Sequence, residues 1–122
     1  MVIHESAEDY LESILRLQER LGSVRSIDIV NELGYSKPSV SIAMKKLREN
    51  GYIAMAADGT LTLNDSGMEI AARIYQRHKT ITQLFTLLGV SPEIAAEDAC
   101  KVEHDLNEET FARITEFVER TK

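Results

Sequence analysis

One segment constrains the fold of this chain more than any other: SKPSVSIAMKKLRENGYI, residues 36–53. Ser36 is a typical N-cap residue, and Pro38 follows early in the helix, where its missing N–H costs little. Three apolar residues recur at helical spacing and define a buried face: Val40, Met44 and Leu47. The segment therefore predicts a capped helix, ended by Gly51, that packs by one face and presents serines and lysines on the others.

The elements predicted before this helix are two further helices. Residues 5–21 carry apolar residues at helical spacing with charges between them: Tyr10, Leu11, Ile14, Leu15, Leu17 and Leu21. A short helix is expected over residues 26–33, with Ser26 as its N-cap and Gly34 as its C-cap. We expect its inward face to hold Ile27, Val30 and Leu33, with Ile29 partly turned in.

The elements predicted after the capped helix begin with two short strands around Asp58-Gly59, a hairpin turn signal. One long helix over residues 65–88 and helices over residues 92–106 and 108–122 follow. We therefore expect a mainly α protein with a small β-wing: a winged helix-turn-helix in residues 1–73, followed by an all-α dimerisation domain in residues 74–122.

Charge is unevenly distributed along the chain. The net charge is −6, which by itself argues against nucleic-acid binding, but residues 36–50 hold four basic residues and one acid. A recognition helix is packed by one face and enters the major groove of DNA with its N-terminal end. We predict DNA contacts from Arg25, Ser26, Ser36, Lys37, Pro38, Ser39, Ser41, Ile42, Lys45 and Lys46. The wing segment AADGT has no Lys or Arg and is expected to contribute little to DNA binding. The alternative to a DNA-binding helix is that KKLREN is only a solvated helical face.

A second feature is the segment CKVEHDL, residues 100–106, which contains the only cysteine. On a helix, Cys100, Glu103 and His104 lie at i, i+3 and i+4 and share a face. A thiol, a carboxylate and an imidazole together suit divalent transition metals. The alternative is a small buried cysteine beside a solvated Glu–His pair, because a structural zinc site needs four protein ligands and this stretch offers three.

Two other groups are ambiguous on their own. Asp9 and Glu12 share a face of the first helix, where acidic residues also gain from the helix dipole. His78 has Arg77 and Lys79 as neighbours and by itself is expected to be an exposed helical histidine, whereas His4 is expected to be loose.

Together these motifs resemble the diphtheria-toxin-repressor superfamily of metal-dependent transcriptional regulators, specifically its manganese-transport-regulator branch. The resemblance covers essentially the whole chain and rests on ESAEDYLESILRL, SKPSVSIAMKKL, LTLNDSG, RHK and ACKVEHDL, in order. It implies a two-domain form without the SH3-like domain of many iron regulators. It also implies the metal ligands Asp9, Glu12, His78, Cys100, Glu103 and His104.

The resemblance implies Mn²⁺ as the cofactor, with Fe²⁺ as the alternative and Zn²⁺, Co²⁺ or Cd²⁺ as substitutes in vitro. Asp9 resembles the manganese branch, because the iron branch has methionine there, whereas Cys100 resembles the iron branch. Thr82 stands where other members place an acid, so an iron-type ancillary site is expected to be incomplete. The ion would clamp the first helix to the second half of the chain and so fix the spacing of two recognition helices.

The expected function is thus a repressor that binds double-stranded operator DNA as a homodimer and controls metal homeostasis. Apolar residues over 81–90 and 111–118 are expected to form the dimer contact. A metal-independent DNA-binding regulator is the alternative. An enzyme using Cys100 and His104 is disfavoured, because we find no nucleophile elbow or Gly-rich loop, and no small organic substrate is expected. An acidic N-terminus without signal-peptide features and the lack of a long apolar run predict a cytoplasmic protein without a membrane span.

Overall fold

The computed structural model describes residues 5–122 and divides into two compact units, the first ending at Ala72 and the second running from Arg73 to Lys122. The described residues form six helices and one two-stranded antiparallel sheet. This confirms the predicted fold class: mainly helical, with a small β-hairpin after the third helix.

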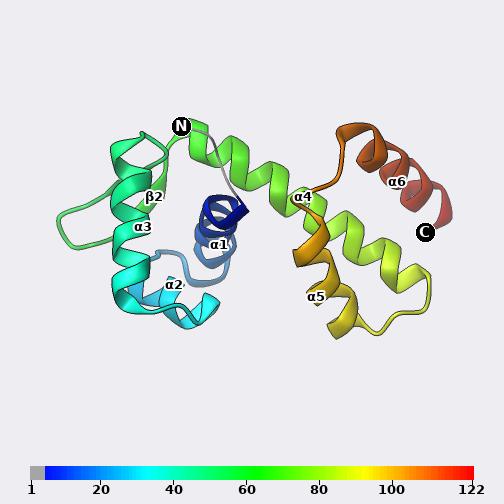
Figure 1. Ribbon diagram of the computed structural model, residues 1–122, viewed down its shortest axis with the longest axis horizontal. Helices are drawn as coiled ribbons and strands as arrows, with labels where there is room; N and C mark the ends of the chain where they lie inside the picture. The colour runs from blue at the N-terminus through cyan, green and yellow to red at the C-terminus, as the bar shows by residue number, and fades with distance from the viewer. Residues whose placement is uncertain (1–4) are drawn as a thin grey trace. The chain divides into compact units, whose positions relative to one another are not determined.

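Unit 1 holds the elements predicted for a winged helix-turn-helix, in the predicted order (Figure 1). They are α1 (Glu5–Leu21), α2 (Ser26–Leu33), α3 (Lys37–Glu49), β1 (Ile53–Met55), β2 (Leu61–Leu63) and the start of α4 (Asp65–Leu87). In the hairpin Ile53 pairs with Leu63 and Met55 with Leu61. Val24 adds an isolated bridge to Leu61, so the chain between α1 and α2 also attaches to the sheet.

The core of unit 1 follows the helical periodicity of the sequence. Its most buried residues include three from α1 and three from α3: Leu11, Ile14, Leu17, Val40, Met44 and Leu47, none more than 2% exposed. Leu21, by contrast, is 51% exposed at the end of α1. Helix α3 is thus fixed by one face, which leaves its polar residues on the surface.

The predicted inward face of α2 is confirmed for Val30 and Leu33, which pack against the core, and is wrong for Ile27. Ile29 is fully buried, whereas Ile27 is 43% exposed, and Val30 and Leu33 are partly buried. In a helix of eight residues both faces carry isoleucine, so periodicity alone does not select one.

Helix ends are set by local hydrogen bonds. Ser36 is the N-cap of α3, and its Oγ accepts from the Ser39 N–H at 3.2 Å, as predicted. Ser26 is not the N-cap of α2 but its first helical residue. The cap is Arg25, whose N–H donates to Asp28 Oδ2 at 2.8 Å. Gly34 ends α2 at a φ of 73°, as expected for a left-handed C-cap.

The junction between the hairpin and α4 is tightly packed. Asn64 and Ser66 both donate from their side chains to the Gly51 carbonyl, and the Asn64 N–H donates to the Tyr52 carbonyl. A Cβ at Gly67 would overlap the Tyr52 carbonyl oxygen. Gly67 is therefore required by the close approach of two backbone segments.

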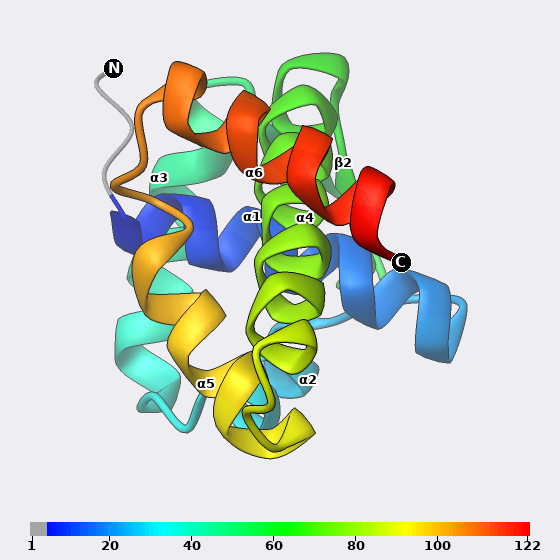
Figure 2. The same ribbon diagram turned by 90° about the vertical axis from the view of Figure 1, so that its right-hand side faces the viewer.

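Unit 2 consists of the remainder of α4, α5 (Pro92–Val102) and α6 (Glu108–Thr121), with α5 and α6 both lying against α4 (Figures 1 and 2). The prediction for α5 was four residues too long: the helix ends at Val102, and Glu103 is its C-cap. Glu103 and His104 therefore lie at the end of the helix rather than within it. Over the described residues, no helix combines the length and apolar character that crossing a membrane requires.

Candidate metal centre and nucleic-acid interface

A cluster of three potential metal ligands lies in unit 2, where α4 meets the end of α5. His78 Nδ1, Cys100 Sγ and a Glu103 carboxylate oxygen all lie within 4.8 Å of one another. His78 Nδ1 is 3.0 Å from Glu103 Oε2 and 3.6 Å from Cys100 Sγ. Two segments that are 22 or more residues apart in the sequence thus bring an imidazole, a thiol and a carboxylate together.

The carboxylate of Glu103 is the most enclosed group of this cluster, with an exposed fraction of 0%. Its Oε2 faces His78, while its Oε1 lies 3.6 Å from His104 Nε2 and has no hydrogen-bond partner among the described residues. The His104 side chain is itself 2% exposed. A buried carboxylate oxygen without a hydrogen bond is costly unless a cation or proton compensates it.

The expectation that His78 is exposed is wrong. His78 is 8% exposed, and its predecessor Arg77 is 4% exposed, whereas Lys79 lies on the surface. The charged neighbours Arg77 and Lys79 suggested that this stretch of helix faces solvent. The local sequence gives no indication that Arg77 is buried. Cys100, conversely, is exposed rather than buried as a small hydrophobe.

Two residues that sequence reasoning left without a role support the cluster. Arg77 donates from Nη1 to the carbonyl oxygens of Glu103 and Leu106. Thr82, interpreted only as a missing acid, donates its hydroxyl to the His78 carbonyl at 2.7 Å. No sequence signal pointed to Arg77, because its partners are backbone carbonyls more than 25 residues away.

The two remaining predicted ligands, Asp9 and Glu12, lie on α1 in unit 1. Both are within the first eight residues of the described helix, and Glu12 Oε2 lies 3.9 Å from Arg16 Nη1. The i, i+3 spacing places them on the same face of α1, as expected. His4 lies outside the described residues.

The donor set of unit 2 fits a divalent cation. The three clustered atoms are close enough for one ion to contact all of them, and the buried Glu103 Oε1 offers a further acceptor. Oxygen, nitrogen and sulfur donors together favour first-row transition metals over calcium or magnesium. The exposed Cys100 gives solvent, and hence an ion, access to the otherwise buried group.

The residues predicted to contact DNA lie mostly on the exposed surface of α3. Lys37, Pro38, Ser39, Ser41, Ile42, Lys45 and Lys46 are all exposed, with Ile42 at 58%. Ser36, also exposed, donates from its Oγ to Ser39 Oγ at 2.8 Å. The N-terminal turn of α3 therefore presents hydroxyls and backbone N–H groups, which suits phosphate or base-edge contacts.

The other two predicted DNA contacts lie at the start of α2. Ser26 is partly buried and Arg25 is exposed. Arg25 Nη2 lies 3.8 Å from Asp58 Oδ2 in the hairpin loop. Asp58 also accepts from the Thr60 N–H at 3.0 Å, and hydrogen bonds from Thr60, assisted by the Arg25 charge, hold the Asp58 pKa below its ordinary value of 3.8. The wing thus carries a persistent negative charge beside Arg25.

Comparison with protein families matches both halves of the chain. Residues 3–61 match the iron dependent repressor N-terminal DNA binding domain, and residues 64–122 match the iron dependent repressor metal binding and dimerisation domain. A transcriptional regulator, MntR, of Escherichia coli O6:H1 is 34% identical over 116 residues, 95% of this chain and 75% of that protein. An uncharacterized HTH-type transcriptional regulator of Methanocaldococcus jannaschii is 35% identical over 120 residues, 97% of this chain and 96% of that protein.

Solved structures share the fold. The crystal structure of T. acidophilum IdeR superposes with a TM-score of 0.84 at 28% identity, over 98% of this chain and 55% of that one. A manganese-dependent transcriptional repressor in complex with manganese also gives a TM-score of 0.84, at 29% identity, over 93% of this chain and 52% of that one. The chain therefore spans about half the length of these solved structures.

Proposed function

The chain belongs to the iron-dependent repressor family of metal-dependent transcriptional regulators, and from that premise we propose that it is a Mn²⁺-responsive repressor that binds operator DNA as a homodimer. The observation that carries the metal part is the cluster of His78, Cys100 and Glu103 within 4.8 Å. We assign DNA binding to residues 1–73 and metal binding and dimerisation to residues 74–122. Members of this family are regulators rather than enzymes.

We propose six metal ligands: Asp9, Glu12, His78, Cys100, Glu103 and His104. The four in unit 2 are supported by the enclosed Glu103 carboxylate, which faces His78 on one oxygen and His104 on the other. The two on α1 are supported by the family resemblance and by the preference of Mn²⁺ for octahedral, oxygen-rich coordination, which four ligands do not complete. Bound here, a dication would neutralise the carboxylates and thiolate, which bind it only when deprotonated.

The donor set bears on the identity of the ion. Carboxylate donors suit Mn²⁺, imidazole suits several transition metals, and the thiolate of Cys100 raises the relative affinity for softer ions such as Fe²⁺ and Zn²⁺. Because intrinsic affinity for Mn²⁺ is lowest in this series, selection depends on geometry and on the metal available in the cell. We propose Mn²⁺ as the physiological ion and Fe²⁺ as the alternative.

DNA binding is assigned to α3 and the start of α2. The buried face of α3 is fixed by Val40, Met44 and Leu47, so its exposed serines and lysines have a defined orientation. We propose that Ser36, Ser39 and Ser41 contact phosphates or base edges, while Lys45 and Lys46 neutralise phosphates. When the protein binds DNA, Arg25 exchanges its contact with Asp58 for a contact with the DNA backbone.

The link between the two activities is a thermodynamic coupling. Two recognition helices in a dimer bind half-sites about 34–36 Å apart only when their spacing is fixed. We propose that ligation by residues of both halves of the chain fixes this spacing, so that metal and DNA strengthen each other's binding. Such coupling is typically about 1–3 kcal/mol, or about 5–150-fold in affinity. We place this activity in the cytoplasm, where the DNA is.

The test is a DNA-binding titration at fixed salt. Duplexes are first selected from a random library with the Mn²⁺-loaded protein, and their affinity is then measured with Mn²⁺, with anaerobic Fe²⁺, with Zn²⁺ and with chelator. We expect Mn²⁺ to tighten binding by about 5–150-fold. Replacing a ligand in either half, by Asp9→Ala or Glu103→Ala, should abolish the metal effect.

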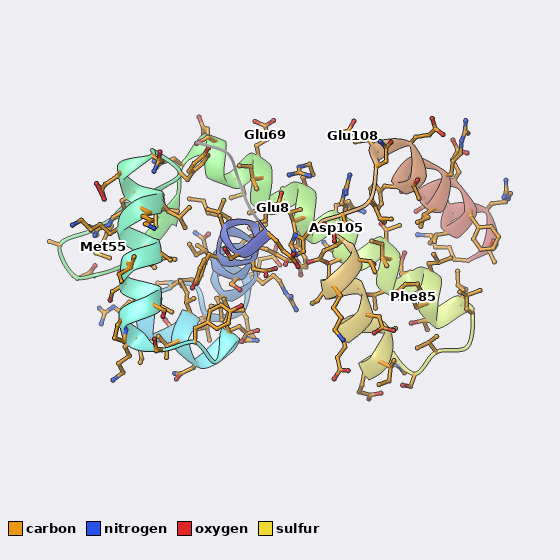
Figure 3. All side chains as sticks on the ribbon, viewed as in Figure 1. Glu8, Met55, Glu69, Phe85, Asp105 and Glu108 are labelled. Carbon is orange, nitrogen blue, oxygen red and sulfur yellow. The ribbon has the colours of Figure 1, made fainter. Side chains whose placement is uncertain are left out.

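The matched control is Glu69→Ala, an exposed glutamate near the start of α4 that is labelled in Figure 3. It should keep the full metal response. Operator affinity that is equal with metal and with chelator would reject metal control and support a metal-independent regulator instead. The match of residues 64–122 to a metal-binding domain disfavours that alternative.

A further inference from the structure

Arg77 is the one arginine of unit 2 whose side chain is enclosed, with the residue 4% exposed. Its Nη1 donates to the Glu103 carbonyl at 3.0 Å and to the Leu106 carbonyl at 2.7 Å. Its guanidinium carbon lies 5.2 Å from the centroid of the Phe111 ring on α6. The side chain thus connects α4 with the end of α5 and with the start of α6.

The carbonyls that Arg77 binds belong to the turn that carries two proposed ligands. Helix α5 ends at Val102, and the chain turns through Glu103 to Leu106 before α6 begins at Glu108. Figure 3 labels Asp105 within this turn and Glu108 just after it. Backbone carbonyls at a helix C-terminus lack partners within the helix and carry partial negative charge. A guanidinium supplied by another helix therefore satisfies them and fixes the turn.

Adjacent residues of α4 hold Glu103 in two ways. His78 Nδ1 contacts the Glu103 carboxylate at 3.0 Å, while Arg77 binds the Glu103 carbonyl. The side chain and the backbone of the same residue are therefore both fixed relative to α4. A ligand held this way loses little freedom when it binds an ion, which is the physical basis of preorganised metal sites.

We propose that Arg77 is a positioning residue for metal binding: it holds the Glu103–Leu106 turn so that Glu103 and His104 are presented to the ion without contacting the ion itself. This inference rests on the proposed function, in that it takes the unit 2 cluster as the metal centre. Removing a residue that orients a metal ligand typically lowers metal affinity about 10–100-fold.

The experiment measures Mn²⁺ and Co²⁺ affinity without DNA, by competition with a fluorescent chelator, in wild type and in Arg77→Met, Arg77→Lys and Arg113→Met. Arg77→Met keeps the aliphatic volume but loses the charge and the donors, so we expect affinity to fall about tenfold or more. Arg77→Lys keeps the charge but is too short to reach both carbonyls, so an intermediate loss is expected. Arg113, an exposed residue of α6 paired with Glu116, is the matched control and should have no effect.

Two readouts separate positioning from a purely structural role. The Co²⁺ absorption spectrum of the Arg77 variants should change in the thiolate charge-transfer region, because displaced Glu103 and His104 would alter the coordination of an ion that Cys100 also binds. Saturating Mn²⁺ should restore operator affinity to the wild-type level, since all six ligands are still present. Thermal unfolding in chelator shows which variants remain folded.

Unchanged metal affinity in a folded Arg77→Met would overturn the proposal. If Arg77→Met does not fold, Arg77→Lys decides: weakened affinity supports positioning, and wild-type affinity overturns it. Failure of the proposed function can be told apart from failure of the Arg77 proposal, because it is seen in the wild type. The wild type would then bind Mn²⁺ tightly without any effect on DNA affinity, or would not bind Mn²⁺ at all.

Discussion

Glu103 is a fully buried carboxylate, and charged residues are rarely found in that state without partners. Its partners come from three places: His78 on α4, the adjacent His104, and Arg77 on its backbone carbonyl. The spacing of Cys100, Glu103 and His104 pointed to this site from the sequence, whereas His78 entered only through the family resemblance. Its charged neighbours suggested exposure, yet the tertiary structure buries it.

The first prediction at the scale of single residues concerns the pKa of Asp58. Its folded-state pKa is lowered, so its ionised form contributes stability at pH values above about 3.8, and this contribution is lost as the pH falls through the folded pKa. An NMR titration of its carboxyl carbon should give a midpoint below 3.8.

The control for this titration is Arg25→Gln, which should raise the Asp58 midpoint only slightly, because the Thr60 hydrogen bonds are the larger cause. A midpoint at or above the ordinary value in the wild type would contradict the hydrogen-bonded wing loop.

At the scale of elements, helix α3 shows how local chemistry fixes a functional surface. Ser36 caps its first turn, and Val40, Met44 and Leu47 fix its inner face. Helix α5 ends at Val102, and Arg77 of α4 donates to the backbone carbonyl of its C-cap residue, Glu103. The sequence predicted a helix over residues 92–106, so this end was not expected.

The cap of α3 gives the second prediction. Ser36→Ala removes the acceptor for the Ser39 N–H and should lower the free energy of unfolding by about 1 kcal/mol. Urea denaturation followed by circular dichroism measures this change.

Ser41→Ala is the matched control for stability, since Ser41 is an exposed serine on the same helix. It should change the free energy of unfolding by less than about 0.5 kcal/mol. Both variants are expected to weaken DNA binding. Equal stability of the two variants would mean that the Ser36 hydroxyl does not cap the helix in solution.

At the scale of the whole molecule, large apolar residues are exposed in both units, whereas the basic residues of unit 1 gather on α3. The net charge is −6, yet residues 36–50 of unit 1, which hold most of the proposed DNA contacts, include four basic residues and one acid. Unit 2 leaves several large apolar residues exposed, including Leu87, Leu88, Ile94 and Phe117. Leu87 and Lys122 line one shallow groove, so the ends of α4 and α6 lie side by side. This surface fits the dimerisation role of the matched domain.

The third prediction concerns this surface. Leu88, 67% exposed, is replaced by glutamate, and self-association is measured by sedimentation equilibrium. Wild type should sediment as two copies. Leu88→Glu should weaken the dimer about tenfold or more, since burial of an unpaired carboxylate costs more than about 1.4 kcal/mol.

Leu21→Glu is the matched control, because Leu21 is a 51% exposed leucine of unit 1. It should leave the dimer intact. If both variants weaken association equally, or if wild type sediments as one copy, unit 2 is not the dimer surface.

The sequence by itself determined the order of helices and strands, the cap of α3, the inner face of that helix and the local grouping of Cys100, Glu103 and His104. These features depend on interactions between residues within about four positions of one another, which periodicity and capping preferences record directly. The order of these elements and the local motifs together were also sufficient to identify the family.

Only the tertiary structure decided which face of α2 is buried, where α5 ends, that His78 is buried and that Arg77 binds the turn carrying the proposed ligands Glu103 and His104. The burial of Ile29 and His78 and the hydrogen bonds of Arg77 depend on contacts between residues far apart in the chain. The spacing of apolar residues within one helix does not record such contacts. The proposed metal centre of unit 2 is of this kind: its potential donors come from α4 and the end of α5, and packing between these elements brings the donor atoms within 4.8 Å of one another.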